Sequence, residues 1–269
     1  REESRFSDAI ETHKKGLMLS VRLCDTLQII QALNNIGTNY RRIGFLEDAS
    51  SYHYKALSYC EAYSDKNNKK LLKNRVISLN GIGNVFLTLE NYQVADSVFR
   101  MALDGERFLG SPLGQAINYA NIGSIFESKG QMDSARYYYQ LSMNFNKEAK
   151  SELGISLCHT HFGRLYEKDG ETDKAIDEYL KAYNTMQFSS DSWHWIESCL
   201  SLARVYIQKG DCGTASVYID KAKKKAVEIH SLEHIADIYH LEYLWNLQKG
   251  DSSKALNSLI KSREYRDSV

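Results

Sequence analysis

Proline, long apolar runs and net charge are nearly absent from this sequence of 269 residues. Its single proline, Pro112, favours long uninterrupted helices and argues against proline-rich linkers. No run of about 18 apolar residues occurs, so we expect no transmembrane helix in this stretch. Basic and acidic residues number 34 each, which gives a net charge of zero. The chain therefore has no overall field that would attract nucleic acid or an anionic membrane, and neither is expected as a partner.

The cysteines are odd in number, and none of them forms a CxxC motif: Cys24, Cys60, Cys158, Cys199 and Cys212. They indicate neither a disulfide framework nor a zinc site, and we interpret them as small buried apolar residues. This mildly favours a reducing compartment without excluding export, so the location stays open between the cytoplasm and the outer side of a membrane-anchored regulator. The sequence begins with arginine and shows no signal peptide, so we expect it to begin inside a longer protein or after processing.

A small residue recurs through the chain at a step of 40 residues. The positions that share this step are Gly83, Gly123, Gly163, Ala203 and finally Tyr243, with Gly37 one slightly longer step earlier. An alanine follows twelve residues after each one, at Ala49, Ala95, Ala135, Ala175, Ala215 and Ala255. Apolar residues on both sides recur at intervals of three and four, which predicts amphipathic helices. The sequence therefore predicts a stack of helical hairpins, each of which buries its apolar faces against its neighbours.

Glycines also mark the turns inside the hairpins, seven residues after the small residue: Gly44, Gly130, Gly170, Gly210 and Gly250. Glycine in this place supplies the left-handed end of one helix before the next begins. The pattern predicts one all-α solenoid over 1–269, in which an unpaired helix precedes six repeats. The expected bounds are 5–20 for the unpaired helix and 26–65, 69–110, 113–149, 152–188, 191–229 and 231–268 for the repeats. The polar string at 64–70 accounts for the one longer step and is expected to be a surface loop.

The order of small residue, aromatic, glycine, alanine and aromatic resembles the tetratricopeptide repeat. The period of 40 is longer than the usual value of about 34, and the proline that normally ends each repeat is missing. The strings LNNIG and YANIG are most similar to the sensor arrays of Bacteroidetes regulators. The resemblance implies a right-handed α-α superhelix of about 13 helices with a concave groove. It also implies a protein or peptide partner and a place as the sensing region of a larger bacterial signalling or transcriptional regulator.

In tetratricopeptide proteins the first helix of each hairpin lines the groove, so the resemblance implies partner-binding residues on these helices. The candidates are Asn34, Asn35, Arg41, Asn80, Asn84, Asn121, Arg164 and Arg204. An asparagine amide can pair with the backbone of a bound peptide, and an arginine can hold a carboxylate through two hydrogen bonds. The alternative is that these side chains connect neighbouring helices or are solvated.

Other motifs give no catalytic site, metal site or cofactor site. The CHTH string places His159 and His161 two residues apart on a helix, where their side chains diverge, so packing is the better interpretation. The basic run at 221–225 indicates a solvated helix end. Trp193 and Trp195 lie outside the repeat positions and are either an anchor for a partner or a cover for a hairpin junction.

A second class of function is left open by the ends of the array. The last repeat carries Tyr243 where a small residue is expected, as a terminal repeat with a different neighbour would. The alternative to a ligand-binding scaffold is therefore a structural adaptor or oligomerisation scaffold, with a homodimer formed through the terminal helices.

Overall fold

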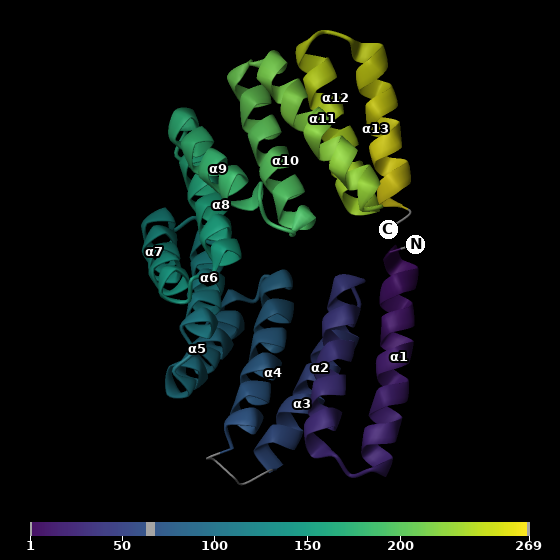
Figure 1. The fold of residues 1–269 in the computed structure, drawn as a ribbon, viewed down its shortest axis with the longest axis vertical. Helices are drawn as coiled ribbons and strands as arrows, with labels where there is room; N and C mark the ends of the chain where they lie inside the picture. Colours follow the sequence, from purple (N-terminus) through teal and green to yellow (C-terminus); the bar gives the residue numbers. More distant parts are fainter. Residues whose placement is uncertain (1, 63–67, 268–269) are drawn as a thin grey trace. The chain divides into compact units, whose positions relative to one another are not determined.

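The computed structural model describes residues 2–62 and 68–267, and Figure 1 shows them as a succession of antiparallel helices. The described part of the chain forms 13 α-helices and contains no β-strand. The helices are α1 (Glu2–Arg22), α2 (Thr26–Arg42), α3 (Leu46–Ala62), α4 (Lys69–Thr88), α5 (Tyr92–Leu109), α6 (Pro112–Ser128), α7 (Met132–Glu148), α8 (Glu152–Lys168), α9 (Thr172–Met186), α10 (Ser192–Lys209), α11 (Cys212–Glu228), α12 (Leu232–Gln248) and α13 (Ser252–Arg266). The prediction of an all-α array with about 13 helices is confirmed. Within the described residues, no helix combines the length and apolarity needed to cross a membrane.

The helices pair as hairpins, α2 with α3, α4 with α5 and so on to α12 with α13, while α1 precedes the first pair. We call the earlier member of each pair the first helix and the later member the second helix. Gly44, Gly130, Gly170, Gly210 and Gly250 all have a positive φ at the turns. Glu90 occupies the corresponding turn between α4 and α5 and also has a positive φ, of 57°. The predicted loop at 64–70 falls largely on residues 63–67, which lie outside the described residues.

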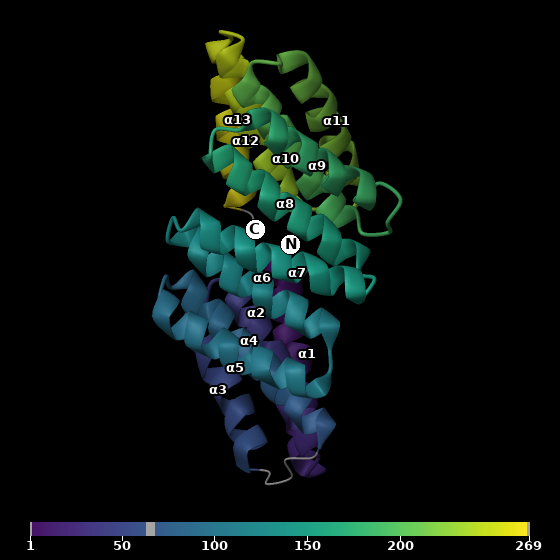
Figure 2. The same cartoon turned by 90° about the vertical axis from the view of Figure 1, so that its left-hand side faces the viewer.

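The chain divides into two compact units, one over residues 3–149 and the other over residues 150–269. In the first unit, each helix from α2 to α6 packs on the next one along the chain, and α6 packs on α7. The two first helices α2 and α4 also contact each other directly. In the second unit, α10 contacts both α8 and α12 in the same way, as the successive labels in Figures 1 and 2 help to follow. First helices of successive hairpins therefore contact each other directly at α2–α4, α8–α10 and α10–α12.

The small-residue positions explain how closely the two helices of a hairpin approach. Gly123 in α6 lies against the ring of Tyr139 in α7, and a Cβ atom on this glycine would lie 2.7 Å from Cδ1 of the tyrosine. Tyr139 has no solvent exposure. The six repeated alanines, from Ala49 to Ala255, are at most 1% exposed. The 40-residue pattern therefore marks the contact between the helices, because a larger side chain at either position would separate them.

Candidate binding face of the first helices

The predicted residue Asn34 is part of the interior of the first unit. It is 2% exposed, and its Nδ2 atom donates to Oγ of Ser78 on α4 at 3.0 Å. Its Oδ1 atom lies 3.0 Å from Nδ1 of the buried His53 on α3. Since Oδ1 can only accept, the histidine carries its proton on Nδ1. Asn34 thus joins three helices, and the structure gives its amide no solvent-facing position for a partner.

Arg204 on α10 also serves the packing of its own unit. Its Nη2 atom donates to Oε2 of Glu167 on α8 at 2.9 Å and to the hydroxyl of Tyr179 on α9 at 3.3 Å. The Tyr179 hydroxyl donates to the same carboxylate. Burial and this carboxylate raise the pKa of Tyr179 well above its usual range, so the phenol stays protonated. These contacts link the first helices α8 and α10 through the second helix α9.

Arg164 and Arg41 are half-buried on their helices. Nη2 of Arg164 lies 2.7 Å from Nδ1 of His161, which stands one turn earlier on α8. Burial, together with the neighbouring charge of Arg42, lowers the pKa of Arg41 from its usual value. Both side chains therefore remain on the surface of a first helix, with less solvent around them than a free arginine has.

The remaining predicted residues are partly or fully accessible. Asn35 is exposed on α2, while Asn80 and Asn84 on α4 and Asn121 on α6 are half-buried. The Oδ1 atom of Asn80 is buried and accepts no hydrogen bond from the described residues. An unsatisfied carbonyl of this kind costs free energy, and its burial keeps it out of reach of a partner's N–H donor.

Exposed aliphatic side chains accompany these asparagines, and the sequence analysis did not single them out. Ile77 on α4 is 43% exposed and Ile117 on α6 is 49% exposed. Each of them stands six residues before the small residue of its repeat, Gly83 or Gly123. The signal in the sequence that could have identified them is this shared position in two successive repeats.

Helical spacing places the isoleucines and the asparagines on one side of each helix. On α4, Asn80 follows Ile77 by three residues and Asn84 follows by seven. On α6, Asn121 follows Ile117 by four. We call the surface formed by these five residues the first-helix face. It offers apolar contact area next to amide groups, a combination that suits an extended peptide with its free backbone donors and acceptors.

The second unit repeats part of this pattern on α8. Leu153 and Leu157 are 37% and 36% exposed and stand four residues apart. Arg164 follows Leu157 by seven residues on the same helix. A first helix of the second unit thus combines exposed leucines with an arginine, where the first unit combines isoleucines with asparagines.

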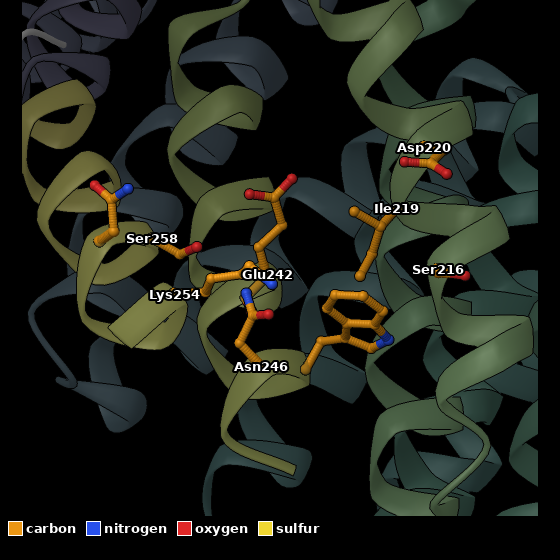
Figure 3. A pocket seen from close by; sticks show the side chains of 9 residues that line it. Ser216, Ile219, Asp220, Glu242, Asn246, Lys254 and Ser258 are labelled. Carbon is orange, nitrogen blue, oxygen red and sulfur yellow. The ribbon is translucent and has the colours of Figure 1, made fainter. Parts of the chain in front are cut away.

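A hollow of about 500 Å³ opens between α11, α12 and α13 and is shown in Figure 3. Asp220 on α11, Glu242 on α12 and Lys254 on α13 contribute charged groups around it. Glu242 is already paired with Lys223 at 2.7 Å. Carboxylates outnumber cations among the lining residues. The hollow is therefore mildly acidic, and we assign it no ligand.

A Ser–His–Glu arrangement occurs in the second unit, but it lies inside the packing. Oγ of Ser231 lies 2.8 Å from Nδ1 of His234, and Nε2 of His234 lies 3.0 Å from Oε1 of Glu197. Ser231 is 1% exposed and His234 has no exposure. Trp193 covers this histidine with a centroid separation of 4.1 Å, and Trp195 packs on Tyr183 at 5.7 Å. Because a nucleophile must reach its substrate, this geometry supports packing and does not support catalysis.

The CHTH string on α8 is likewise used for packing. Cys158 is 1% exposed, and Nδ1 of His159 pairs with Oε2 of Glu178 on α9 at 2.7 Å. This histidine and a lysine lower the pKa of Glu178 despite its partial burial. Within the described residues, no three histidine, cysteine or acidic side chains are arranged to hold a metal ion.

Comparison with known proteins agrees with this architecture. Residues 29–64 match the family model of the tetratricopeptide repeat. Comparison with curated protein sequences finds no significant match. The predicted resemblance to tetratricopeptide arrays is confirmed by this match and by the solved structures described next.

Three similar solved structures show the same kind of helical array. The Rap conjugation gene regulator of plasmid pLS20, in complex with a Phr peptide, has a TM-score of 0.73 and 16% identity, over 88% of this chain and 64% of that one. Aspartyl phosphate phosphatase F from Bacillus subtilis has a TM-score of 0.69 and 17% identity, over 97% and 68%. A tetratricopeptide repeat protein from Parabacteroides merdae has a TM-score of 0.60 and 16% identity, over 96% and 93%. At these identities the likeness establishes the fold, which is that of a tetratricopeptide-like helical solenoid.

Proposed function

We propose that this tetratricopeptide-type array is a protein- or peptide-binding scaffold, and that its first-helix face holds an extended segment of the partner. The observation that carries the proposal is the exposure of Ile77 and Ile117 at the same position of two successive repeats. The exposed part of an isoleucine contributes nothing to the packing of its own hairpin, whereas this apolar surface stabilises a complex when a partner covers it. The peptide bound to the similar Rap regulator supports the same use of the fold.

The asparagines supply the polar half of the proposed contact. An extended peptide makes no hydrogen bonds between its own backbone groups, and an asparagine side chain can donate to a carbonyl and accept from an N–H at once. Asn35 is exposed, and Asn80, Asn84 and Asn121 are half-buried, so part of each side chain remains accessible. The predicted set therefore remains in the proposal, except for Asn34 and Arg204, whose groups are engaged inside the units. Arg41 and Arg164 would contact acidic residues of the partner.

We propose further that the array acts without catalysis, as the sensing region of a larger bacterial signalling or transcriptional regulator. Repeat arrays bend at the interfaces between their units, so a partner that favours one curvature shifts the population of an attached module. A protein named as a phosphatase has a similar fold, so the non-catalytic part of the proposal is tested by a phosphatase assay, in which this protein is expected to show no activity. The buried Ser231–His234 pair supports the non-catalytic proposal.

The test uses linear twelve-residue peptides selected from a random phage library against the 269-residue protein. Binding of the selected synthetic peptides is then measured for the wild type and for Ile77→Gln/Ile117→Gln. The double variant is expected to raise the Kd at least about tenfold, because two apolar contacts of roughly 1 kcal/mol or more are lost. Met101→Gln is the matched control, since Met101 on the second helix α5 is also 43% exposed. Equal binding by the wild type and the double variant would contradict the assignment of the first-helix face.

A second candidate, self-association, is favoured by an exposed apolar group near the end of α1. Met18, Leu19 and Val21 are 59%, 57% and 52% exposed, and Leu23 just beyond the helix is 69% exposed. Contiguous apolar surface of this kind marks interaction sites in soluble proteins. Sedimentation velocity of the wild type and of Met18→Gln/Leu19→Gln distinguishes the two functions. A concentration-dependent dimer that the double variant abolishes would favour the oligomerisation scaffold.

A further inference from the structure

A pocket of about 360 Å³ lies between α5, α6 and α7 of the first unit, away from the isoleucines of the first-helix face. Two arginines of α5, Arg100 and Arg107, stand at its edge together with Asp104. Tyr119 of α6 and Tyr138 of α7 contribute phenol groups. The pocket is therefore a cluster of guanidinium and hydroxyl groups, and no part of the proposed peptide contact uses it.

The hydrogen bonds in this pocket leave the O–H groups of two tyrosines without an acceptor in the described part of the chain. Nη2 of Arg107 donates to the hydroxyl of Tyr119 at 3.0 Å, and Nη2 of Arg100 donates to the hydroxyl of Tyr138 at 3.2 Å. A guanidinium has five N–H donors and accepts nothing, so each phenol oxygen is the acceptor and keeps its own proton available. Among the described residues, neither of these two hydroxyls donates a hydrogen bond. A ligand in the pocket would thus meet two O–H donors, each bonded to an arginine that is itself paired with an aspartate.

The two phenol rings are held in place by aromatic stacking. Tyr138 stacks on Phe126 with centroids 5.2 Å apart, and Tyr119 stacks on Phe145 at 5.4 Å. The guanidinium of Arg100 lies over the Tyr138 ring, 5.8 Å from its centroid. A site whose groups are fixed before binding loses less entropy when a ligand arrives.

An apolar wall adjoins the donors. Tyr137 is 61% exposed and meets the edge of Tyr138 with centroids 5.3 Å apart. Leu103, which is 3% exposed, also borders the pocket. Exposed tyrosine provides rigid contact area at a low entropic cost, as it does in binding surfaces generally. The pocket therefore combines hydroxyl donors at one end with an exposed aromatic ring at its side.

We propose that this pocket binds a carboxylate-bearing residue of a partner peptide, with the carboxylate between the hydroxyls of Tyr119 and Tyr138. An aromatic or aliphatic group next to that carboxylate would pack on Tyr137. Carboxylates form the strongest hydrogen bonds with donors of this kind, and charge assistance from the arginines adds to them. Two carboxylates bonded to these arginines oppose this binding. Asp96 is bonded to Nε of Arg100 at 2.8 Å. Asp104, with a side chain 72% exposed, is bonded to Nη1 of Arg107 at 3.0 Å.

Two of the lining positions of this pocket can be compared with positions that line the hollow of the second unit. The hollow between α11, α12 and α13 in Figure 3 has Asp220 where Arg100 stands 120 residues earlier. It has Ser258 in the place of Tyr138. These two positions thus carry a carboxylate and a short hydroxyl in the second unit, whereas Tyr239 stands where Tyr119 does in the first.

The experiment titrates the 269-residue protein, carrying ¹³C-labelled tyrosine rings, with three probes followed by nuclear magnetic resonance. N-acetyl-L-phenylalanine carries a terminal carboxylate, acetyl-aspartyl-phenylalaninamide carries a side-chain carboxylate, and N-acetyl-L-phenylalaninamide is neutral. We expect the ring signals of Tyr119, Tyr137 and Tyr138 to shift with at least one carboxylate probe and not with the neutral one. The carboxylate probe that binds more tightly identifies the source of the group. Shifts of equal size with all three probes, or with none, would overturn the proposal.

Variants connect the binding to the assigned groups. Tyr119→Phe/Tyr138→Phe keeps both stacked rings and is expected to raise the Kd of the carboxylate probe at least about tenfold, since hydrogen bonds to charged groups are lost. Asp104→Asn is expected to lower the Kd, because it removes one of the opposing charges. Tyr206→Phe, in the second unit, is the matched control. An unchanged Kd in the double variant would reject the site, and Ile77→Gln/Ile117→Gln should leave the Kd unchanged, which separates this result from the proposed function.

Discussion

The ring of Phe99 in α5 lies directly against the backbone of Gly83 in α4, so closely that a Cβ atom on the glycine would lie 2.5 Å from Cε1 of the ring. The same relation joins Gly163 to Tyr179, also with 2.5 Å to Cε1. Where the small residue is Ala203, the residue sixteen positions later is Ile219. A glycine is therefore paired with a ring, whereas an alanine is paired with a branched aliphatic side chain.

This relation predicts that the sizes of the two positions are coupled. Gly83→Ala gains up to about 1 kcal/mol of helix propensity but overpacks against Phe99, which costs about 1–3 kcal/mol, so we expect a net loss of stability. Gly83→Ala/Phe99→Ile reproduces the Ala203 and Ile219 pair and should lose less than the sum of the single variants, by at least about 1 kcal/mol. Urea unfolding of the four proteins measures this coupling.

Gly16 provides the control for helix propensity, because it lies within α1 and no side chain approaches its Cβ position within 4 Å. Gly16→Ala is expected to stabilise the protein by up to about 1 kcal/mol. If the changes in the free energy of unfolding caused by Gly83→Ala and Phe99→Ile were strictly additive, contact with the Phe99 ring would not be the reason for glycine at position 83.

The fold could be predicted because glycine, alanine and aromatic residues recur at a fixed spacing, which is typical of closely packed helical hairpins stacked in an array. The individual site residues could be predicted less well. Asn34 and Asn35 are neighbours of the same type, yet one is buried and the other exposed. The difference arises from Ser78, which belongs to the next hairpin and is not identifiable as a partner by spacing alone.

The exposed isoleucines show that the sequence pattern also fails to distinguish an exposed apolar residue from a core residue. On an amphipathic helix, an apolar residue is normally interpreted as core, and Ile77 fits that expectation as a sequence position. In the packed array it is nevertheless 43% exposed, and periodicity along one helix does not show which apolar positions the neighbouring helices cover. Arg204 was predicted as a partner contact, but the carboxylate of Glu167, 37 residues earlier, holds it.

His53 predicts an acid-sensitive stability. Burial, with a smaller contribution from Arg41, lowers the pKa of His53 from 6.5 to about 4. Its Nε2 atom is buried and has no hydrogen-bond partner among the described residues, so a proton there would have no acceptor. The unfolded chain binds this proton below about pH 6.5 and the folded chain does not, so the free energy of unfolding falls as the pH falls from about 6.5 to about 4.

The full effect amounts to about 3 kcal/mol, at 1.36 kcal/mol for each pKa unit. His53→Phe places the ring found at the equivalent position, Phe99, and should remove this part of the pH dependence whatever it does to stability at pH 7. Urea unfolding of both proteins between pH 7 and pH 4 measures the slopes. Parallel curves for the wild type and the variant would contradict the assignment to His53.

Arg204 predicts a loss of stability when its side chain is removed. The carboxylate of Glu167 has only 14% of its side chain exposed and accepts from both Arg204 and Tyr179. Arg204→Ala would leave this charge poorly compensated, at a cost of about 1–3 kcal/mol. Lys15→Ala is the control, because Lys15 and Glu11 form an exposed pair and its loss should cost less than about 1 kcal/mol. Thermal unfolding measures both variants, and similar small shifts for the two would argue against a structural role for Arg204.

The cysteines predict a selective reaction with a thiol reagent. The interpretation of all five cysteines as buried is wrong for Cys24, which is exposed, whereas Cys60 and Cys199 are 4% and 0% exposed. Burial raises the pKa of Cys60 to about 11 and that of Cys199 to about 12. Since the thiolate is the nucleophile, these two thiols are both inaccessible and protonated at pH 8. We expect the exposed Cys24 to react fastest with a chromogenic disulfide reagent in the native protein and the partly exposed Cys212 to react more slowly, so Cys24→Ser should lose the fastest phase. A fast phase that persists in Cys24→Ser would show that a covered thiol is accessible, and unfolding in urea should release all five.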